Sequence, residues 1–238
     1  MRIKLLSLAL LLLSGNLQAA TKFEHWKTSQ GVPVYYLNTP DLPMVDIRVA
    51  FDAGSARDEK QYGIASLTSS LLDTGAGKWN ADDIAQRFES VGAQFGVGAS
   101  TDSASLSLRT LVEPKLFNKA LETMQVILTQ PTFAKADFER KQKQMLAGLK
   151  HREESPASIA GLAFDKALYG DHPYAYPSSG YTETVSKFKA ADAKTFYQRY
   201  YVSTNAMVVI VGALDKKLAK ETAEKLMAKL PKGEKTTP

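Results

Sequence analysis

The sequence predicts an α+β fold with a mixed, largely antiparallel β-sheet covered by helices. Strand-like segments come in consecutive groups, and several longer segments carry a helical apolar stripe. Strict alternation of strands and helices, which would indicate a doubly wound nucleotide-binding fold, is missing. No internal repeat or low-complexity segment is visible.

The first part of the chain predicts three strands followed by two helices. Residues 23–28 and 34–37 flank a Ser-Gln-Gly turn, and apolar residues alternate with more polar ones along 45–51. Residues 62–72 form a mostly apolar segment with a helical pattern. Asn80 is typical of the residue that caps a second helix.

The rest of the chain predicts a hairpin, a helix-rich region and one buried strand. Residues 94–100 and 103–111 are typical of two strands joined by the turn Thr101-Asp102. A broad apolar stripe begins at Pro114, which is tolerated in a first helical turn, and Pro131 ends that helix. Further helices are expected over 135–154, 156–169, 190–200 and from Asp215, with a strand over 206–211.

The first twenty residues have the pattern of a secretory signal peptide. Two basic residues precede the apolar run 5–13, and small residues lead to a cleavage site after Ala19 or Ala20. The run is too short for a membrane-spanning helix, which needs about 20 residues. We therefore expect residues 1–20 to be removed and the protein to be periplasmic or secreted.

The remainder is expected to form one domain, residues 21–230, followed by a polar, linker-like tail at 231–238. The chain has no cysteine, which excludes a disulfide framework and a lipoprotein-type lipid attachment site. Removal of Arg2 and Lys4 with the signal lowers the formal net charge from +5 to +3. This charge is too small to indicate nucleic-acid binding, and no integral membrane segment is expected after cleavage.

Two common catalytic patterns are absent. Residues 75–78 resemble part of a phosphate-binding loop, but that motif needs glycine at position 72 and serine or threonine at 79, where Leu72 and Trp79 stand. A serine nucleophile needs a base, and its usual Gly-x-Ser-x-Gly elbow does not occur. Neither nucleotide binding nor serine catalysis is expected.

A metal site built from the chain's own histidines is not expected either. His25 lies on a predicted strand and His172 precedes a proline in a loop, so both are interpreted as surface or turn residues. His151 and Glu154 are three residues apart at the end of a charged helix, and they are typical of an ordinary solvated helix terminus.

Landmarks of a known family are spaced along nearly the whole mature chain. They are Gly54-Ser55, Gly63-Ile64-Ala65, Leu71-Leu72, Gly75-Ala76, His172-Pro173-Tyr174, Gly180, the aromatic segment 196–201, and Asn205-Ala206 leading through 208–211 to Gly212. In this order and spacing they resemble the first-half domain of the M16 (pitrilysin / mitochondrial processing peptidase-like) zinc metallopeptidase family. The resemblance implies the fold of an M16 peptidase-like half.

The resemblance also implies that the zinc motif has been lost. Active members carry His-x-x-Glu-His on the helix after Gly-x-Ala, where the histidines bind Zn²⁺ and the glutamate activates its water. The corresponding residues here are Ser66, Ser69 and Ser70, and Ala147 replaces a further glutamate ligand. Serine is a poor zinc ligand and no general base near neutral pH. No catalytic residue and no metal ligand is therefore expected in this chain.

A peptide-binding edge is a further implication of the resemblance. In this family the substrate is similar to an added β-strand, which pairs with an exposed sheet edge beside the zinc helix. The corresponding residues here are Gly98, Ala99, Ser100 and Thr101, whose small side chains admit another backbone. The alternative is that the small side chains of this strand serve packing within the domain and not the binding of a peptide.

Three hypotheses for function follow. The first is a non-catalytic periplasmic subunit that pairs with a zinc-bearing M16-type chain and helps to bind or enclose peptides, and it predicts an exposed apolar patch. The second is a subunit of an active zinc metalloendopeptidase complex with zinc supplied in trans. The third is a truncated M16 protein, lacking its second half, that acts as a stand-alone peptide-binding domain. This chain itself is expected to hold no cofactor, and zinc is expected only in a partner.

Overall fold

The computed structural model describes residues 23–236, and the predicted signal peptide at 1–20 lies outside them. This part of the chain has the predicted α+β fold. None of its helices is long and apolar enough to cross a lipid bilayer. The strands are β1 (Glu24–Lys27), β2 (Pro33–Asn38), β3 (Met44–Phe51), β4 (Gly75–Ala76), β5 (Trp79–Asn80), β6 (Gln94–Ala99), β7 (Ala104–Leu111) and β8 (Ala206–Gly212).

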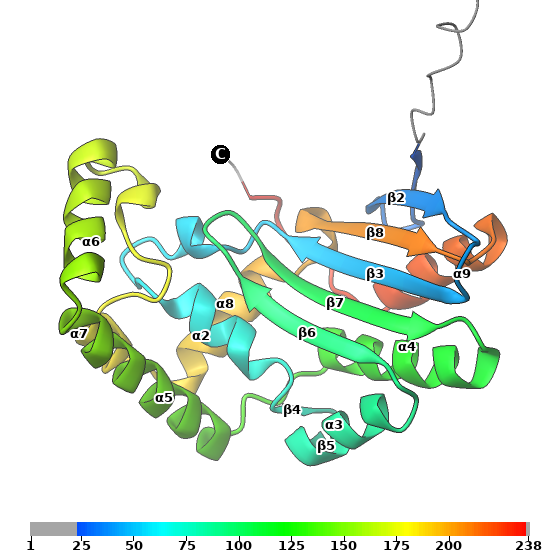
Figure 1. Ribbon diagram of the computed structural model, residues 1–238, viewed down its shortest axis with the longest axis horizontal. Coiled ribbons are helices and arrows are strands. Elements are labelled where there is room, and N and C mark those ends of the chain that lie inside the picture. Colours follow the sequence, from blue (N-terminus) through cyan, green and yellow to red (C-terminus); the bar gives the residue numbers. More distant parts are fainter. Residues whose placement is uncertain (1–22, 237–238) are drawn as a thin grey trace, which may run out of the picture.

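Six strands form the main sheet in the order β1-β2-β8-β3-β7-β6, and only the β2–β8 pair is parallel (Figure 1). The last strand of the chain thus lies at the centre, between β2 and β3. Strand β6 forms one edge and β1 the other. β4 and β5 form a separate two-stranded ribbon.

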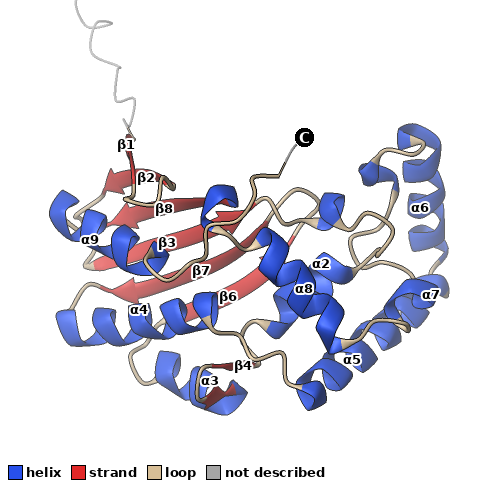
Figure 2. Cartoon of the chain, turned by 180° about the vertical axis from the view of Figure 1, so that it is seen from behind, coloured by secondary structure: helices blue, strands red, loops and turns tan. Residues whose placement is uncertain are grey.

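Helices cover one face of the sheet, and several extend beyond the end of the strands at which the β6–β7 turn lies (Figure 1). They are α2 (Ile64–Leu71), α3 (Ala81–Glu89), α4 (Pro114–Thr129), α5 (Lys135–Glu153), α6 (Pro156–Tyr169), α7 (Thr182–Val185), α8 (Ala190–Tyr200) and α9 (Lys216–Met227). α4 and α9 lie across the covered face, and α2 packs against α5, α8 and β6 (Figure 2). The core forms between sheet and helices, with Ile47, Leu106 and Ile210 almost completely buried.

No helix of the described chain lies over the opposite face of the sheet (Figure 1). The side chains on this open face alternate with core residues along β3, which explains the predicted pattern of apolar and polar positions. Arg109 on β7 donates two hydrogen bonds to the Asp46 carboxylate on β3, at 2.7 and 2.9 Å. The open face is therefore polar and charged along β3 and β7, whereas the central strand β8 presents the apolar side chains of Met207, Val209 and Val211 there.

Helix α2 begins at a buried carboxylate. Asp58 accepts hydrogen bonds from the backbone N–H groups of Gly63 (2.6 Å) and Ala65 (3.0 Å), at the helix end where such donors lack partners within the helix. Burial raises the pKa of Asp58 to about 7, and the two hydrogen bonds oppose this shift. Asp58 therefore fixes the position at which α2 begins.

Two glycines allow a loop to lie directly on this helix start. Gly63 (φ +99°) and Gly180 (φ +70°) have positive φ angles, which residues with side chains rarely adopt. A Cβ atom at Gly180 would overlap the carbonyl group of Tyr62 and lie 2.9 Å from the Cα of Gly63. Both glycines are among the residues that carry the family resemblance in the sequence. The close approach of the two backbones explains why glycine is needed at these two positions.

The C-terminal tail follows the surface of the domain up to Thr236. Its composition predicts a linker away from the core, but the Pro231 carbonyl accepts from the N–H of Ser203 (2.9 Å), and the Thr236 N–H donates to Asn205 Oδ1 (2.8 Å). The Thr236 hydroxyl also donates to Asp52. These contacts correct the expectation of a detached tail, while its role as a linker to another domain stays a prediction.

Substitution of Gly180 by alanine tests the close approach at α2. We expect Gly180→Ala to lower the free energy of unfolding by about 3 kcal/mol or more, because overlap with backbone atoms adds to the cost of the left-handed conformation. Gly92 (φ +62°) is the matched control, because a Cβ there meets nothing within 4 Å. Gly92→Ala should cost about 1 to 2 kcal/mol. Urea unfolding measures both, and equal losses would contradict the steric argument.

The pH dependence of stability tests the buried state of Asp58. Its folded-state pKa of about 7 lies above the unfolded value, so the folded protein retains a proton that the unfolded chain releases. The unfolding free energy of the wild type relative to Asp58→Asn should therefore fall as the pH rises from about 4 to about 7, by at most about 1.4 kcal/mol per pH unit. Urea unfolding at several pH values measures this difference, and a constant difference would contradict a raised pKa.

Candidate functional site

The three serines at the motif positions lie on α2 but have different surroundings. The Ser66 hydroxyl donates to the Ser178 carbonyl (2.7 Å), and the Ser70 hydroxyl donates to the Leu67 carbonyl in its own helix (2.8 Å). Ser69 is only 1% exposed, and its hydroxyl lies beside the buried phenol of Tyr201. The position of the general base in active family members is thus closed off from solvent.

Ala147, at the position of the further glutamate ligand, lies on α5. Helix α5 packs against α2, but the Ala147 side chain is exposed, whereas Phe138 and Leu149 are the buried residues of this helix. A methyl group offers no lone pair to a metal or to a proton. The four predicted positions therefore lie on two neighbouring helices and supply no carboxylate or imidazole.

The loop that ends at Gly180 is held against the first turn of α2. Arg152, near the end of α5, donates from Nη1 to the Ser179 hydroxyl (2.6 Å) and from Nη2 to the Gly180 carbonyl (2.7 Å). Together with the bond from Ser66 to Ser178, these contacts fix three consecutive loop residues. The side chain at the first motif position, Ser66, is therefore engaged in a hydrogen bond within the domain.

Three tyrosines beside this loop form a cluster that sequence reasoning missed. The ring of Tyr62 stacks on Tyr176 (centroids 4.3 Å apart) and meets Tyr181 edge-on (5.7 Å). Burial, followed by a hydrogen bond with Tyr176, raises the pKa of Tyr62 to about 12. Its phenol stays neutral at physiological pH, so it packs the loop and offers no base. Tyr62 is more than 100 residues away from Tyr176 and Tyr181 in the chain, so no short-range pattern links it to them.

The described residues do not fit a zinc ion. Between residues 23 and 236, no group of three or more His, Cys, Asp or Glu side chains lies together in a way that could hold a metal. His172 has a structural role instead, since its Nδ1 accepts from the backbone N–H of Tyr174 (3.2 Å). Among the motif positions, Ser66 is engaged with the loop and Ser69 is buried.

The edge strand β6 offers free backbone groups next to α2. In an antiparallel pair, alternate residues exchange hydrogen bonds with the neighbouring strand while those between them point outward. The Ser100 N–H donates to the Ser103 carbonyl (2.8 Å), so Gly98 and Gly96 also face β7. The N–H and C=O groups of the intervening residues therefore point away from the sheet. They belong to Phe95, Val97 and Ala99.

This geometry corrects the predicted extent of the edge. Gly98 and Ala99 lie on β6, but Ser100 and Thr101 belong to the turn. The carbonyls of these two turn residues accept from the N–H groups of Ser55 (3.0 Å) and Ala56 (2.8 Å), and so cannot pair with an added strand. The available edge runs over 94–99.

A pocket of about 520 Å³ adjoins the start of β6, between α3 and α5. Ile84, Phe88 and Phe95 form apolar walls, and the two phenylalanine rings stack with centroids 4.6 Å apart. Burial raises the pKa of Asp73 in the same pocket, and Lys141 opposes the shift. An apolar side chain of a peptide lying along β6 would fit this pocket.

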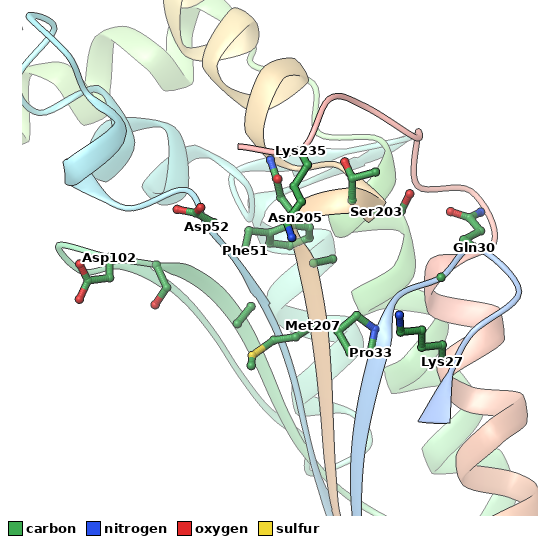
Figure 3. A pocket seen from close by; sticks show the side chains of 15 residues that line it. Lys27, Gln30, Pro33, Phe51, Asp52, Asp102, Ser203, Asn205, Met207 and Lys235 are labelled. Carbon is green, nitrogen blue, oxygen red and sulfur yellow. The ribbon is translucent and has the colours of Figure 1, made fainter. Parts of the chain in front are cut away.

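A second groove, of about 610 Å³, lies at the end of the sheet where β3 ends and β8 begins (Figure 3). Its two carboxylates already have partners. Burial acts to raise the pKa of Asp52, but hydrogen bonds from Arg57 and Thr236 outweigh it and lower the pKa. Asp102 accepts from the Tyr174 hydroxyl (2.7 Å). These groups hold the structure together and offer no free ligand set.

Sequence comparisons connect this geometry with known proteins. Residues 33–180 match the family described as Insulinase (Peptidase family M16), and residues 187–238 match Peptidase M16 inactive domain. The chain is 30% identical over 195 residues to the non-peptidase homologue YmxG of Helicobacter pylori, which covers 81% of this chain and 44% of the relative. It is 24% identical to an uncharacterized zinc protease of Rickettsia felis over 88% of this chain and 51% of that protein.

Solved structures show the same fold. The crystal structure of a peptidase M16 inactive domain from Pseudomonas fluorescens superposes with a TM-score of 0.88 at 35% identity, over 91% of this chain and 52% of that one. The periplasmic protease PqqL from Escherichia coli superposes at 0.80 with 18% identity, over 91% of this chain and 25% of PqqL. The chain thus spans about half the length of the curated relatives it matches. Because one family match covers more than half of its residues, the chain belongs to peptidase family M16, although it lacks the family's zinc motif.

Proposed function

We propose that this chain is a non-catalytic M16-type subunit that pairs with a zinc-bearing peptidase relative and helps to bind or enclose peptide substrates. The observation that carries the proposal is the combination of a free, slim edge strand β6 with an adjoining helix α2 that holds serine at all three motif positions. Strand addition uses backbone groups, so peptide binding does not depend on the lost side chains.

The two edges of the main sheet differ in a way that favours β6 as the peptide site. β1 carries Glu24 and Lys27, and Glu24 forms an ion pair with Lys216. Charged residues and shortness protect a strand edge from pairing. β6 carries no charged residue and includes Gly96 and Gly98. Its outer side therefore accepts another strand more readily.

The open face of the sheet supports a role in enclosing substrates. Its β3 and β7 strands, with the Arg109–Asp46 pair, are suited to line a water-filled space, while the neighbouring strand β8 presents the apolar side chains of Met207, Val209 and Val211. The signal pattern at 1–20 favours a periplasmic location, and the relative PqqL is described as a periplasmic protease. A zinc-bearing partner in the same compartment would supply the catalytic site.

A second candidate function is that of a stand-alone peptide-binding domain. It is favoured by one observation: β6, α2 and the pocket between α3 and α5 all belong to this single chain, which spans only about half the length of its relatives. On this view no partner is needed for binding, whereas the first proposal requires one. Peptide binding by the isolated chain, together with failure to bind any zinc-bearing relative, would favour the second candidate.

Reconstitution tests the main proposal. The purified mature chain is mixed with a purified M16 relative from the same genome that has an intact His-x-x-Glu-His motif, and hydrolysis of an unstructured fluorescent peptide is followed. We expect no hydrolysis by the chain alone with or without added zinc, a stable complex, and faster hydrolysis by the complex than by the relative alone. Chelator-sensitive hydrolysis by the chain alone, or failure to form a complex, would contradict the proposal.

Proline substitution at two adjacent positions tests the β6 edge. Ala99→Pro removes an outward N–H, and should weaken binding of an unstructured peptide about ten-fold while largely preserving the fold. Gly98→Pro removes an N–H that faces β7, and should lower the unfolding free energy by about 2 to 3 kcal/mol. Fluorescence anisotropy and urea unfolding measure the two effects. Unchanged peptide affinity in a folded Ala99→Pro protein would exclude this edge.

Glutamate substitution tests whether position 69, which holds the general base in active family members, is buried away from solvent. Ser69→Glu puts a carboxylate at a position that is 1% exposed, and should cost about 3 kcal/mol or more. Ser70→Glu, at a partly exposed position on the same helix, is the control and should cost about 1 kcal/mol. Urea unfolding at pH 7 compares them. Equal stability of the two variants would mean that the side chain at position 69 can reach solvent.

A further inference from the structure

Helix α6 has its apolar side turned outward. With 100° between successive residues, one half of its circumference holds only apolar side chains. These side chains are exposed, with Phe164 at 65%, Leu168 at 58% and Ile159 at 52%. We call this surface the α6 face, and it consists of Ile159, Ala160, Ala163, Phe164, Ala167 and Leu168.

The side of α6 that faces the domain is the more polar one. Ser158, Leu162 and Asp165 on this side are partly buried, and no residue of the helix is fully buried. The domain contacts α6 mainly through α5 and the short turn Pro173–Ala175. In an ordinary surface helix the apolar stripe faces the core, so the orientation of α6 is inverted. α6 forms the outer end of the domain, well away from the sheet (Figure 1).

Charge argues against a membrane as the covering surface. Helices that lie on membranes carry several lysines or arginines around the apolar face. α6 has only Lys166, whose amino group donates to the Gly170 carbonyl (2.7 Å) and to the Asp171 carboxylate (3.0 Å). An uncharged apolar face of this kind is typical of a contact with another protein.

We propose that the α6 face is the docking surface for a second M16-type half, and this inference rests on the pairing proposed above. The relatives are about twice as long as this chain, which covers 44% of the Helicobacter pylori protein and 52% of the Pseudomonas fluorescens one. Such proteins contain a comparable length of further chain in addition to the half that matches. A face that is apolar and uncharged is suited to permanent contact with that second half, whether it is in the same chain or a separate one.

A charge placed on the α6 face tests this assignment. Phe164→Asp and the control Leu42→Asp replace exposed apolar residues of nearly equal exposure (65% and 63%), the control being between β2 and β3. Binding to a purified zinc-bearing M16 relative from the same genome is measured by calorimetry. We expect Phe164→Asp to weaken binding roughly ten-fold or more and Leu42→Asp to leave it unchanged. Both variants should melt at the wild-type temperature, because neither residue is buried.

The possible outcomes separate this inference from the proposed function. If the wild type binds the relative and Phe164→Asp binds as tightly, the α6 assignment is wrong while pairing stands. If the wild type does not bind the relative, the proposed pairing fails and the α6 assignment fails with it. The assigned occupant is a half that differs from this chain. If the wild-type chain alone sediments as a dimer and Phe164→Asp as a monomer, the face binds a second copy of this chain instead, and the assignment is overturned.

Discussion

The contact between two backbones at the start of α2 is the constraint on which the rest of the site depends. Gly63 and Gly180 leave no side chain between the helix and the loop. The Asp58 carboxylate fixes the start of the helix by accepting hydrogen bonds from two backbone N–H groups. Arg152 then fixes the loop from the side of α5. The helix that carries zinc ligands in active M16 members is therefore a fixed structural element here, with the Ser66 hydroxyl bonded to the loop.

The same region also fixes the position of the edge strand β6. The N–H groups of Ser55 and Ala56 bind the carbonyls of the β6–β7 turn, and the Tyr174 hydroxyl binds Asp102 at the tip of that turn. The strand is thus fixed at its turn end while its outward groups remain free. A preformed edge loses little conformational entropy on binding. Loss of the zinc motif is compatible with the proposed peptide binding, because the motif consists of side chains whereas strand addition uses the backbone.

The features that depend on neighbouring residues in the sequence could be predicted. Asn80 caps α3 with a reciprocal bond to Asp83, Asp215 caps α9, and the β6–β7 turn lies at Thr101-Asp102. The α+β class and the family also followed from the sequence, and the absence of the zinc motif could be read from residue types alone.

Features that depend on distant parts of the chain could not be predicted. The role of Asp58 is one of these features, because only the folded chain buries its carboxylate at the start of α2. The direction of the free groups on β6 depends on the hairpin register, which moved the edge from residues 98–101 to 94–99. The pattern of α6 predicted a helix, but not that its apolar side faces away from the domain.

Amide hydrogen exchange along β6 tests the central claim that this chain binds peptides by strand addition. In the free protein, the N–H groups of Gly96 and Gly98 should be protected and those of Phe95, Val97 and Ala99 should exchange rapidly. Addition of an unstructured peptide should protect these three outward groups and leave the peptide intact. Protection of β1 instead, or no change at these three residues at saturating peptide, would contradict the account.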